Sequence, residues 1–195
     1  MTICCPIPVT VPTSVTGRIT STFNATTNIG SITAGTNRVD YKNIERLNIS
    51  GTAYNDKIVG NDGNDTLSGR IGNDTLTGGA GNDTFVFDGF YSKDGNYPYY
   101  DGTDTITDFS GVGKDSNPSV EVINSLDTLQ FTTDGYTAQN LQLTQNGNNL
   151  EITFESYYGN NTKVILQNFK LENLNNLPAN SSRPAIGNIL VFWTN

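Results

Sequence analysis

A large apolar residue recurs at every ninth position between residues 50 and 85. The four units read SGTAYNDKI, VGNDGNDTL, SGRIGNDTL and TGGAGNDTF, with no gap between them. Each unit closes on its apolar residue, and these closing residues are Ile58, Leu67, Leu76 and Phe85. Because side chains alternate between the two faces of a strand, the end of each unit predicts a minimal strand that sends the apolar residue inward. Each unit therefore predicts one turn followed by one short strand.

Further short strands are expected on both sides of the repeats. Residues 15–41 are rich in Thr, Ile and Val with glycine turns, and they predict strands that pair onto the first coil and protect its open edge. Residues 149–154 alternate between apolar and polar, and Asn146-Gly147 predicts the turn of a β-hairpin formed with residues 141–145. Residues 164–174 predict another strand and a bend.

These patterns predict an all-β fold, a parallel β-roll built as a nonapeptide-repeat solenoid with β caps at both ends. We expect the N-terminal cap at residues 1–49, the roll at 50–109 and a C-terminal extension or cap at 110–195. A tyrosine-rich insertion, residues 88–103, interrupts the roll. Its tyrosines fit the packing of a surface loop, and stacking on a sugar or a protein partner is the alternative.

Composition excludes several classes of function. The chain has 11 basic and 19 acidic residues, a net charge of −8, which disfavours nucleic acid and anionic membranes as partners and favours a multivalent cation. Histidine is absent, which removes His-based triads, histidine general bases and imidazole zinc sites. The longest apolar run, residues 189–193, is far too short for a membrane span, so no transmembrane segment is expected.

The first residues predict neither a targeting signal nor an ordinary disulfide. The opening MTICCPIPVTVPT lacks a basic segment and is interrupted by prolines, so we expect no cleavable secretory signal. Cys4 and Cys5 are neighbours, closer than ordinary disulfide geometry prefers. We expect free thiols there, with an intermolecular or strained vicinal bond as the alternative.

The polar part of each unit is suited to holding a cation. Glycine permits positive φ and close backbone approach, so the first six or so residues of a unit can curl into a turn whose carbonyls point at one spot. If two units make one coil, Asp56 stacks over Asp74 and Asp65 over Asp83, about 4.8 Å apart. At an effective dielectric of about 20, two such charges repel by about 3 to 4 kcal/mol. A Ca²⁺ ion reverses that sign, because it accepts mixed carboxylate and carbonyl oxygens at flexible geometry.

The repeats resemble those of the RTX (repeats-in-toxin) hemolysin-type calcium-binding proteins, whose pattern is G-G-x-G-x-D-x-Φ-x. GGAGNDTF matches it fully, GRIGNDTL and GNDGNDTL match in all but one glycine, and GTAYNDKI matches more loosely. NIERLNISGTAYNDKIVG is similar to the usual lead-in, and DTITDF, residues 104–109, to the D-x-I-x-D-F exit. DTLQF and LQLTQNGNNLEITF resemble the family's C-terminal extension, which carries the match to about residue 174.

The resemblance implies several calcium ions, held by loop carbonyls and the repeat aspartates. One site would use Gly51, Ala53, Asp56, Arg70, Gly72 and Asp74. A second would use Gly60, Asp62, Asp65, Gly79, Gly81 and Asp83. Further sites above the third and fourth loops would use Gly69, Ile71, Gly78 and Ala80, with Asp104 and Asp108 of the exit motif as partners.

We therefore expect a secreted, extracellular, non-enzymatic calcium-binding protein whose roll folds on binding calcium. Its role would be structural, adhesive or partner-binding, toward a cell surface, an extracellular polymer or a protein. The resemblance implies type I export through an uncleaved C-terminal segment, and the tail IGNILVFWTN fits that signal or a last core strand.

Two other functions stay open at this point. RTX rolls are often attached to enzymes, so the alternative is a calcium-stabilised appendage of an enzyme or a small polysaccharide-acting hydrolase or lyase. The missing histidine, G-x-S-x-G and H-E-x-x-H motifs count against it. An intracellular calcium buffer or sensor is the third hypothesis, and the EF-hand pattern ending in a Glu ligand is missing after residues 62–65.

Overall fold

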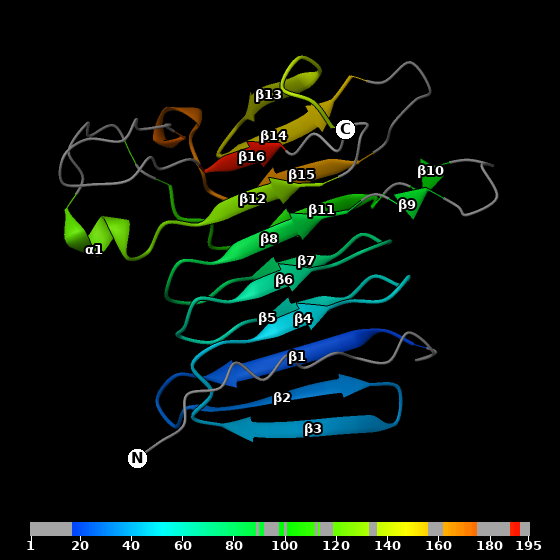
Figure 1. The fold of residues 1–195 in the computed structure, drawn as a ribbon, viewed down its shortest axis with the longest axis vertical. Coiled ribbons are helices and arrows are strands. Elements are labelled where there is room, and N and C mark those ends of the chain that lie inside the picture. The colour runs from blue at the N-terminus through cyan, green and yellow to red at the C-terminus, as the bar shows by residue number, and fades with distance from the viewer. Residues whose placement is uncertain are drawn as a thin grey trace.

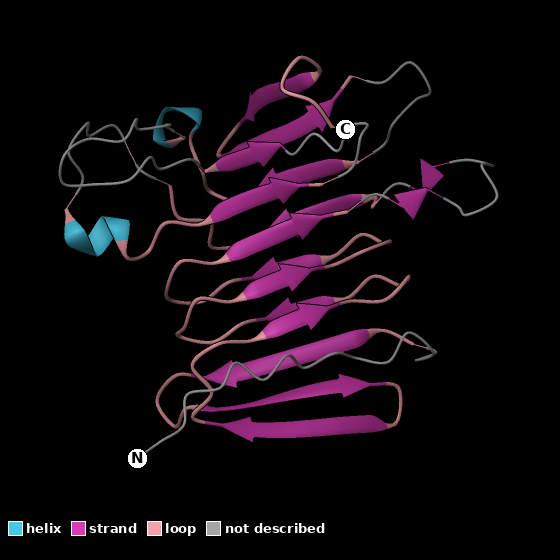
Figure 2. Cartoon of the chain, in the orientation of Figure 1, coloured by secondary structure: helices cyan, strands magenta, loops and turns pink. Residues whose placement is uncertain are grey.

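Figure 1 shows a computed structural model of the chain as a tall stack of short strands. The structure describes residues 17–88, 90–91, 98–99, 101–111, 113, 119–132, 136–155, 162–174 and 188–191. Strands make up nearly all of the regular structure in this part of the chain (Figure 2). Cys4, Cys5, Trp193 and half of the tyrosine-rich insertion lie outside the described residues.

Two sheets form the walls of the stack. The larger sheet has the order β13-β14-β15-β11-β7-β5-β1-β2-β3, and the smaller has the order β16-β12-β8-β6-β4. The strands of the larger sheet are β1 (Ile19–Asn24), β2 (Ile29–Ala34), β3 (Asn37–Lys42), β5 (Lys57–Val59), β7 (Thr75–Thr77), β11 (Thr103–Ile106), β13 (Leu141–Asn146), β14 (Asn149–Phe154) and β15 (Lys163–Leu166). Those of the smaller sheet are β4 (Asn48–Ser50), β6 (Thr66–Ser68), β8 (Thr84–Phe87), β12 (Thr128–Phe131) and β16 (Ile189–Val191).

The remaining elements are small and lie in the connections between coils. β9 (Phe90–Tyr91) and β10 (Pro98–Tyr99) form an antiparallel ribbon. The helical elements among the described residues are α1 (Val120–Ile123) and the 3₁₀ turn η1 (Leu171–Asn173). In the described part of the chain we find no helix with the length and apolar character that a membrane crossing requires.

Successive repeats deliver their strands to opposite sheets. Ile58 pairs in parallel with Leu76 in the larger sheet, and Leu67 pairs in parallel with Phe85 in the smaller one. Equivalent residues of stacked coils are thus 18 positions apart. The predicted all-β parallel roll, with two repeats per coil, is confirmed.

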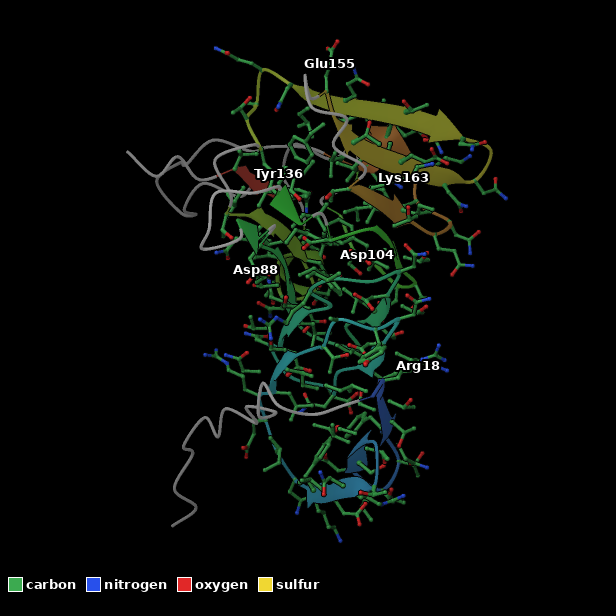
Figure 3. The ribbon with its side chains drawn as sticks, turned by 90° about the vertical axis from the view of Figure 1, so that its right-hand side faces the viewer. Arg18, Asp88, Asp104, Tyr136, Glu155 and Lys163 are labelled. Atoms are coloured by element: carbon green, nitrogen blue, oxygen red, sulfur yellow. The ribbon has the colours of Figure 1, made fainter. Side chains whose placement is uncertain are left out.

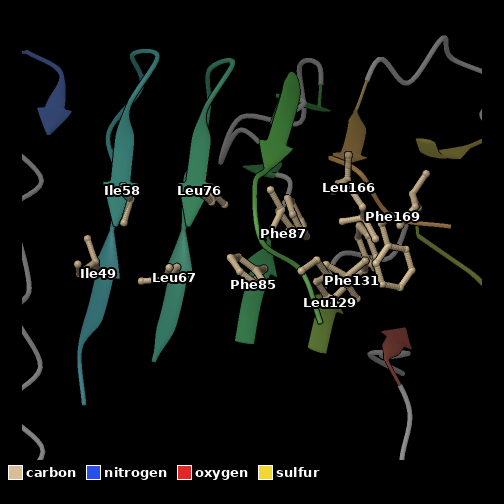
Figure 4. Close-up of a cluster of buried hydrophobic side chains, with 14 of the residues drawn as sticks. Ile49, Ile58, Leu67, Leu76, Phe85, Phe87, Leu129, Phe131, Leu166 and Phe169 are labelled. Atoms are coloured by element: carbon tan, nitrogen blue, oxygen red, sulfur yellow. The ribbon is translucent and has the colours of Figure 1, made fainter. Parts of the chain in front are cut away.

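The apolar residues that close the repeats form the core between the two sheets (Figure 4). Ile58, Leu67, Leu76 and Phe85 have no exposed surface. Toward the C-terminal end aromatic rings take over, and the Phe131 ring lies 5.0 Å from Phe87 and 4.8 Å from Phe154, measured between centroids. Each such side chain removes a large apolar area from water, which is the main favourable term in folding.

Three strands, β1 to β3, form the N-terminal end of the larger sheet. β1 pairs in parallel with β5, and β2 and β3 continue from it in antiparallel order. The edge strand β3 carries exposed charges at Arg38, Asp40 and Lys42. Such charges discourage pairing with a further strand, because an added chain would have to bury them.

The parallel ladders run on beyond residue 109, where the sequence analysis ended the roll. β11 pairs with β7 and then with β15, while β12 pairs with β8 and then with β16. The described part of the C-terminal tail is therefore the last strand of the smaller sheet. The predicted hairpin is β13–β14, and since Asn146 pairs with Asn149, its loop is Gly147–Asn148, one residue later than expected.

Candidate metal centre

Two columns of loops run along the sides of the roll, between the strands of one sheet and those of the other (Figure 2). The first loop column consists of residues 51–56, 69–74 and 101–104, and the second of residues 43–47, 60–65 and 78–83. Backbone hydrogen bonds join each loop to the strand end that leads into the loop above it: Gly51 N donates to Ser68 O at 2.7 Å, and Gly60 N donates to Thr77 O at 2.8 Å. The loops of both predicted sites are thus stacked in pairs.

Glycine is required where a loop rests on the carbonyl oxygens of the loop beneath it. Gly79 has φ +100°, and a Cβ added there would lie 2.0 Å from the carbonyl oxygen of Asn61. Gly102 has φ +102°, and its Cβ would lie 2.0 Å from the carbonyl oxygen of Gly72. Because only glycine permits both this φ and this approach, the pattern of glycines keeps backbone oxygens between the loops.

The repeat aspartates form a ladder within each column. Each carboxylate accepts the backbone N–H of the equivalent residue in the coil below. In the first column Asp74 Oδ1 accepts from Asp56 N at 2.7 Å, and Asp104 Oδ1 accepts from Asp74 N at 2.9 Å. In the second column Asp83 Oδ1 accepts from Asp65 N at 2.9 Å. These bonds stack the carboxylates along each side of the roll.

The asparagine before each aspartate bonds in the opposite direction. Asn55 Oδ1 accepts from Asn73 N, and Asn64 Oδ1 accepts from Asn82 N, both at 2.9 Å. Each Asn-Asp pair therefore ties its loop to the coils on both sides. The sequence analysis gave this asparagine no role.

Two ladder carboxylates each have a buried oxygen with no hydrogen-bond partner, namely Asp74 Oδ2 and Asp83 Oδ2. In the first coil the matching oxygens are satisfied, since Thr52 N donates to Asp56 Oδ2 and Asn61 N to Asp65 Oδ2, both at 2.6 Å. Leaving a buried charged oxygen without a partner is costly. The two unpartnered oxygens therefore fit a bound cation.

Calcium suits this donor set. Among the described residues, no three acidic or cysteine side chains gather closely enough to hold a metal by themselves. A metal held between the loops would take most of its ligands from their backbone carbonyls, with one or two carboxylates, and Ca²⁺ accepts this mixture of oxygens.

Burial raises the pKa of the ladder carboxylates well above the ordinary aspartate value. The pKa rises to about 6 for Asp65, about 7 for Asp74, about 8 for Asp83 and about 9 for Asp104. The charge of the neighbouring Asp56 contributes in the same direction for Asp74. Near neutral pH the metal-free roll must therefore either hold protons on these groups or carry the cost of buried charges.

Comparison with known proteins agrees with this geometry. The hemolysin-type calcium-binding family, described as the RTX calcium-binding nonapeptide repeat, matches residues 50–85 in 4 copies. These residues are RTX calcium-binding repeats. RTX repeats bind calcium, so the ion that suits the donor set is also the ion of the family. No match to the chain was found among curated proteins.

Among solved structures the chain is similar to the extracellular lipase LipA from Serratia marcescens. The sequence identity is 16% and the TM-score is 0.36. The match covers 88% of this chain and 32% of the lipase chain, so this chain spans about a third of that protein's length.

Most of the predicted ligand positions lie in the stacked RTX loops. The first pair of loops contains Gly51, Ala53, Asp56, Gly69, Arg70, Ile71, Gly72 and Asp74, and the second contains Gly60, Asp62, Asp65, Gly78, Gly79, Ala80, Gly81 and Asp83. Asp104 continues the ladder above Asp74. Asp108 does not continue the ladder above Asp83, because its two oxygens accept the amides of Gly78 and Gly79, each at 2.9 Å.

Asp127 occupies the ladder position above Asp83, and the sequence analysis did not select it. Its Oδ1 accepts from Asp83 N at 3.0 Å. The signal was available, since the Asp-Thr-Leu triplet of residues 127–129 repeats that of residues 65–67 and 74–76. The nine-residue period did not reveal Asp127, because it lies 44 residues after Asp83 and two long crossovers interrupt the period between them.

The steric role of the RTX glycines gives a first prediction. Gly79→Ala is expected to destabilise the calcium-loaded roll by about 3 kcal/mol or more, because the clash with Asn61 O adds to backbone strain. Gly147→Ala is the matched control: Gly147 has φ +59° with nothing within 4 Å of an added Cβ, so only about 1 kcal/mol is expected. Thermal unfolding in saturating calcium measures both. Equal losses for the two variants would show that the loops are not stacked this closely.

Proposed function

We propose that this chain is a secreted RTX protein that binds several calcium ions and folds on binding them, with a structural, adhesive or partner-binding role outside the cell. The observation that carries the proposal is the pair of unpartnered, buried oxygens of Asp74 and Asp83, each placed between two stacked RTX loops. A bound cation satisfies these oxygens and offsets the repulsion along each aspartate ladder.

The proposed ligands follow the two loop pairs. One ion lies between residues 51–56 and 69–74, and a second lies between residues 60–65 and 78–83. Further ions lie above residues 69–74, with Asp104, and above residues 78–83, with Asp127. When bound, calcium supplies positive charge and accepts the loop carbonyls, while the chain itself supplies the stacked turns and the ladder that aligns them.

We propose a non-enzymatic role because the chain contains no histidine and neither the G-x-S-x-G nor the H-E-x-x-H motif. Beyond the repeats, the described strands extend or cover the roll rather than forming a second core. An activity screen on polysaccharides and esters, with and without calcium, tests this part. Calcium-dependent turnover that persists through purification would contradict it.

Calorimetric titration of the metal-free chain with calcium tests whether its calcium affinity suits the extracellular space or the cytosol. We expect dissociation constants in the high micromolar range or weaker, which leave the sites empty at cytosolic calcium and filled at extracellular levels. Magnesium should bind far more weakly, because it requires a tighter octahedral site. Submicromolar binding would instead support an intracellular buffer, and no binding would contradict the proposal.

A further inference from the structure

Asp101 carries the most unusual buried carboxylate in the described part of the chain. Its exposure is 1%, and both of its side-chain oxygens lack a hydrogen-bond partner. At Asp74 and Asp83 only one oxygen lacks a partner. A carboxylate removed from water with neither oxygen satisfied is among the costliest arrangements in a protein, so something must offset it.

Asp101 does not belong to the RTX pattern. The ladder aspartate of its coil is Asp104, and Asp101 stands three residues earlier, where the loop below has Ile71. The carbonyl of Asp101 follows the regular stacking and accepts Gly72 N at 2.7 Å. The repeat thus accounts for the backbone of Asp101 but not for its buried charge.

A second acidic residue, Asp88, contributes negative charge at Asp101 from the other end of residues 89–100. Asp88 directly follows β8, and Asp101 lies two residues before the first residue of β11, so the pair stands at the two ends of residues 89–100. Burial, followed by the negative charges of Asp88 and then Asp74, raises the pKa of Asp101 to about 8, against the opposing charge of Arg70. The pKa of Asp88 is itself raised by burial and lowered by the charge of Arg70, so this guanidinium lies near both carboxylates.

Residues from the coil above cover Asp101. Tyr136 donates its hydroxyl hydrogen to Thr162 Oγ1 at 2.9 Å, and the backbone N–H of Asp101 donates to the same oxygen at 3.3 Å. Tyr136 is 3% exposed, and Figure 3 shows it on the same side of the stack as Asp88. The carboxylate of Asp101 is thus held beneath a covered surface, where water cannot replace a missing partner. Asp88 is partly buried, and its Oδ1 accepts a hydrogen bond from Ser68 Oγ at 3.4 Å.

We propose that Asp88 and Asp101 bind an additional calcium ion outside the aspartate ladder, which fastens both ends of the tyrosine-rich insertion to the roll. Two carboxylates offer hard oxygen ligands, the class that Ca²⁺ prefers, and neutral oxygens complete its coordination. This site differs from the RTX sites, because side chains of the insertion boundary take the place of loop carbonyls. The choice of ion rests on the proposed function.

The variant Asp101→Asn tests the site in the full-length chain, with Asp40→Asn on the exposed β3 edge as the control. Native mass spectrometry counts bound calcium, and thermal unfolding is followed in chelator and in saturating calcium. Asp101→Asn is expected to bind one ion fewer than the wild type and to gain less in Tm from calcium. In chelator its Tm is expected to rise, because an unpaired buried charge has been removed. Asp40→Asn should match the wild type throughout.

A buried carboxyl group without a cation gives a different result. Asp101→Asn would then raise Tm in both conditions and bind as many ions as the wild type, which would overturn the proposal. Asp88→Asn is the second variant: it also should bind one ion fewer, and an unchanged count would overturn the proposal even if Asp101→Asn failed to fold. A wild-type chain that binds no calcium contradicts the proposed function itself, whereas unchanged counts in both variants contradict only this site.

Discussion

The double variant Asp74→Asn, Asp83→Asn is expected to lose most of the calcium dependence of folding. Without metal it should be more stable than the wild type, and with calcium it should gain little. Asparagine keeps the side-chain oxygen that accepts the amide of the coil below, so the ladder bonds from Asp56 N and Asp65 N survive. It removes the buried negative charge, which is the ligand that the metal needs and the group that destabilises the metal-free roll.

The size of the effect follows from the pKa values. Burial raises the pKa of Asp74 to about 7 and that of Asp83 to about 8. At pH 8 or above, ionising each carboxylate in the metal-free roll costs on the order of 4 kcal/mol, a large fraction of a domain's stability of about 5 to 15 kcal/mol. Urea unfolding in chelator and in calcium measures the change.

Asp62→Asn is the control for this pair. Asp62 lies in an RTX loop, but its side chain is exposed and only its carbonyl is a proposed ligand. We expect it to keep nearly the whole calcium response. The account would be contradicted if the double variant were as unstable in chelator as the wild type, or if it kept the full stabilisation by calcium.

Acidification of the metal-free wild-type chain is expected to stabilise its fold. The pKa values of the ladder aspartates are higher in the folded chain than in the unfolded one, so the folded state binds more protons. Their contribution is complete below an ordinary aspartate pKa of about 4. It is lost as the pH rises through about 6 for Asp65, about 7 for Asp74 and about 8 for Asp83.

Circular dichroism of dialysed, metal-free protein between pH 5 and pH 9 tests this dependence. The β signal and the unfolding free energy should both fall as the pH rises, and the Asp74→Asn, Asp83→Asn variant should show a shallower fall. In the presence of calcium, the metal competes with protons for the same oxygens, so calcium affinity should rise with pH. The stabilisation that calcium provides should therefore increase with pH, opposite to the trend of the metal-free chain. Metal-free stability that is flat or increases over this range would show that the buried carboxylates do not control folding.

Regular spacing explains which parts of this structure follow from sequence alone. A nine-residue period with an apolar residue in each unit is compatible with few folds other than a solenoid. With two units per coil, the period alone places Asp56 beside Asp74. The stacked RTX loops were therefore predictable residue by residue. Local alternation was enough for the β13–β14 hairpin, although not for the exact loop, since the register of Asn146 with Asn149 depends on pairing along the whole hairpin.

Residues beyond the regular spacing were not predictable in the same way. Asp127 joins the ladder only because crossovers of different lengths bring β12 back beside β8. Asp101 becomes a buried charge only because Tyr136 and Thr162, from a later coil, close over it. Both features depend on contacts between distant segments, and no local pattern of residues encodes such contacts.

Far-UV circular dichroism during a calcium titration of the metal-free chain at pH 8 tests the central claim most directly, with magnesium as the control. The account predicts a cooperative gain of β signal that calcium produces and magnesium does not. A full β spectrum in chelator that calcium leaves unchanged would contradict it, because the aspartate ladders would then be stable without the ion.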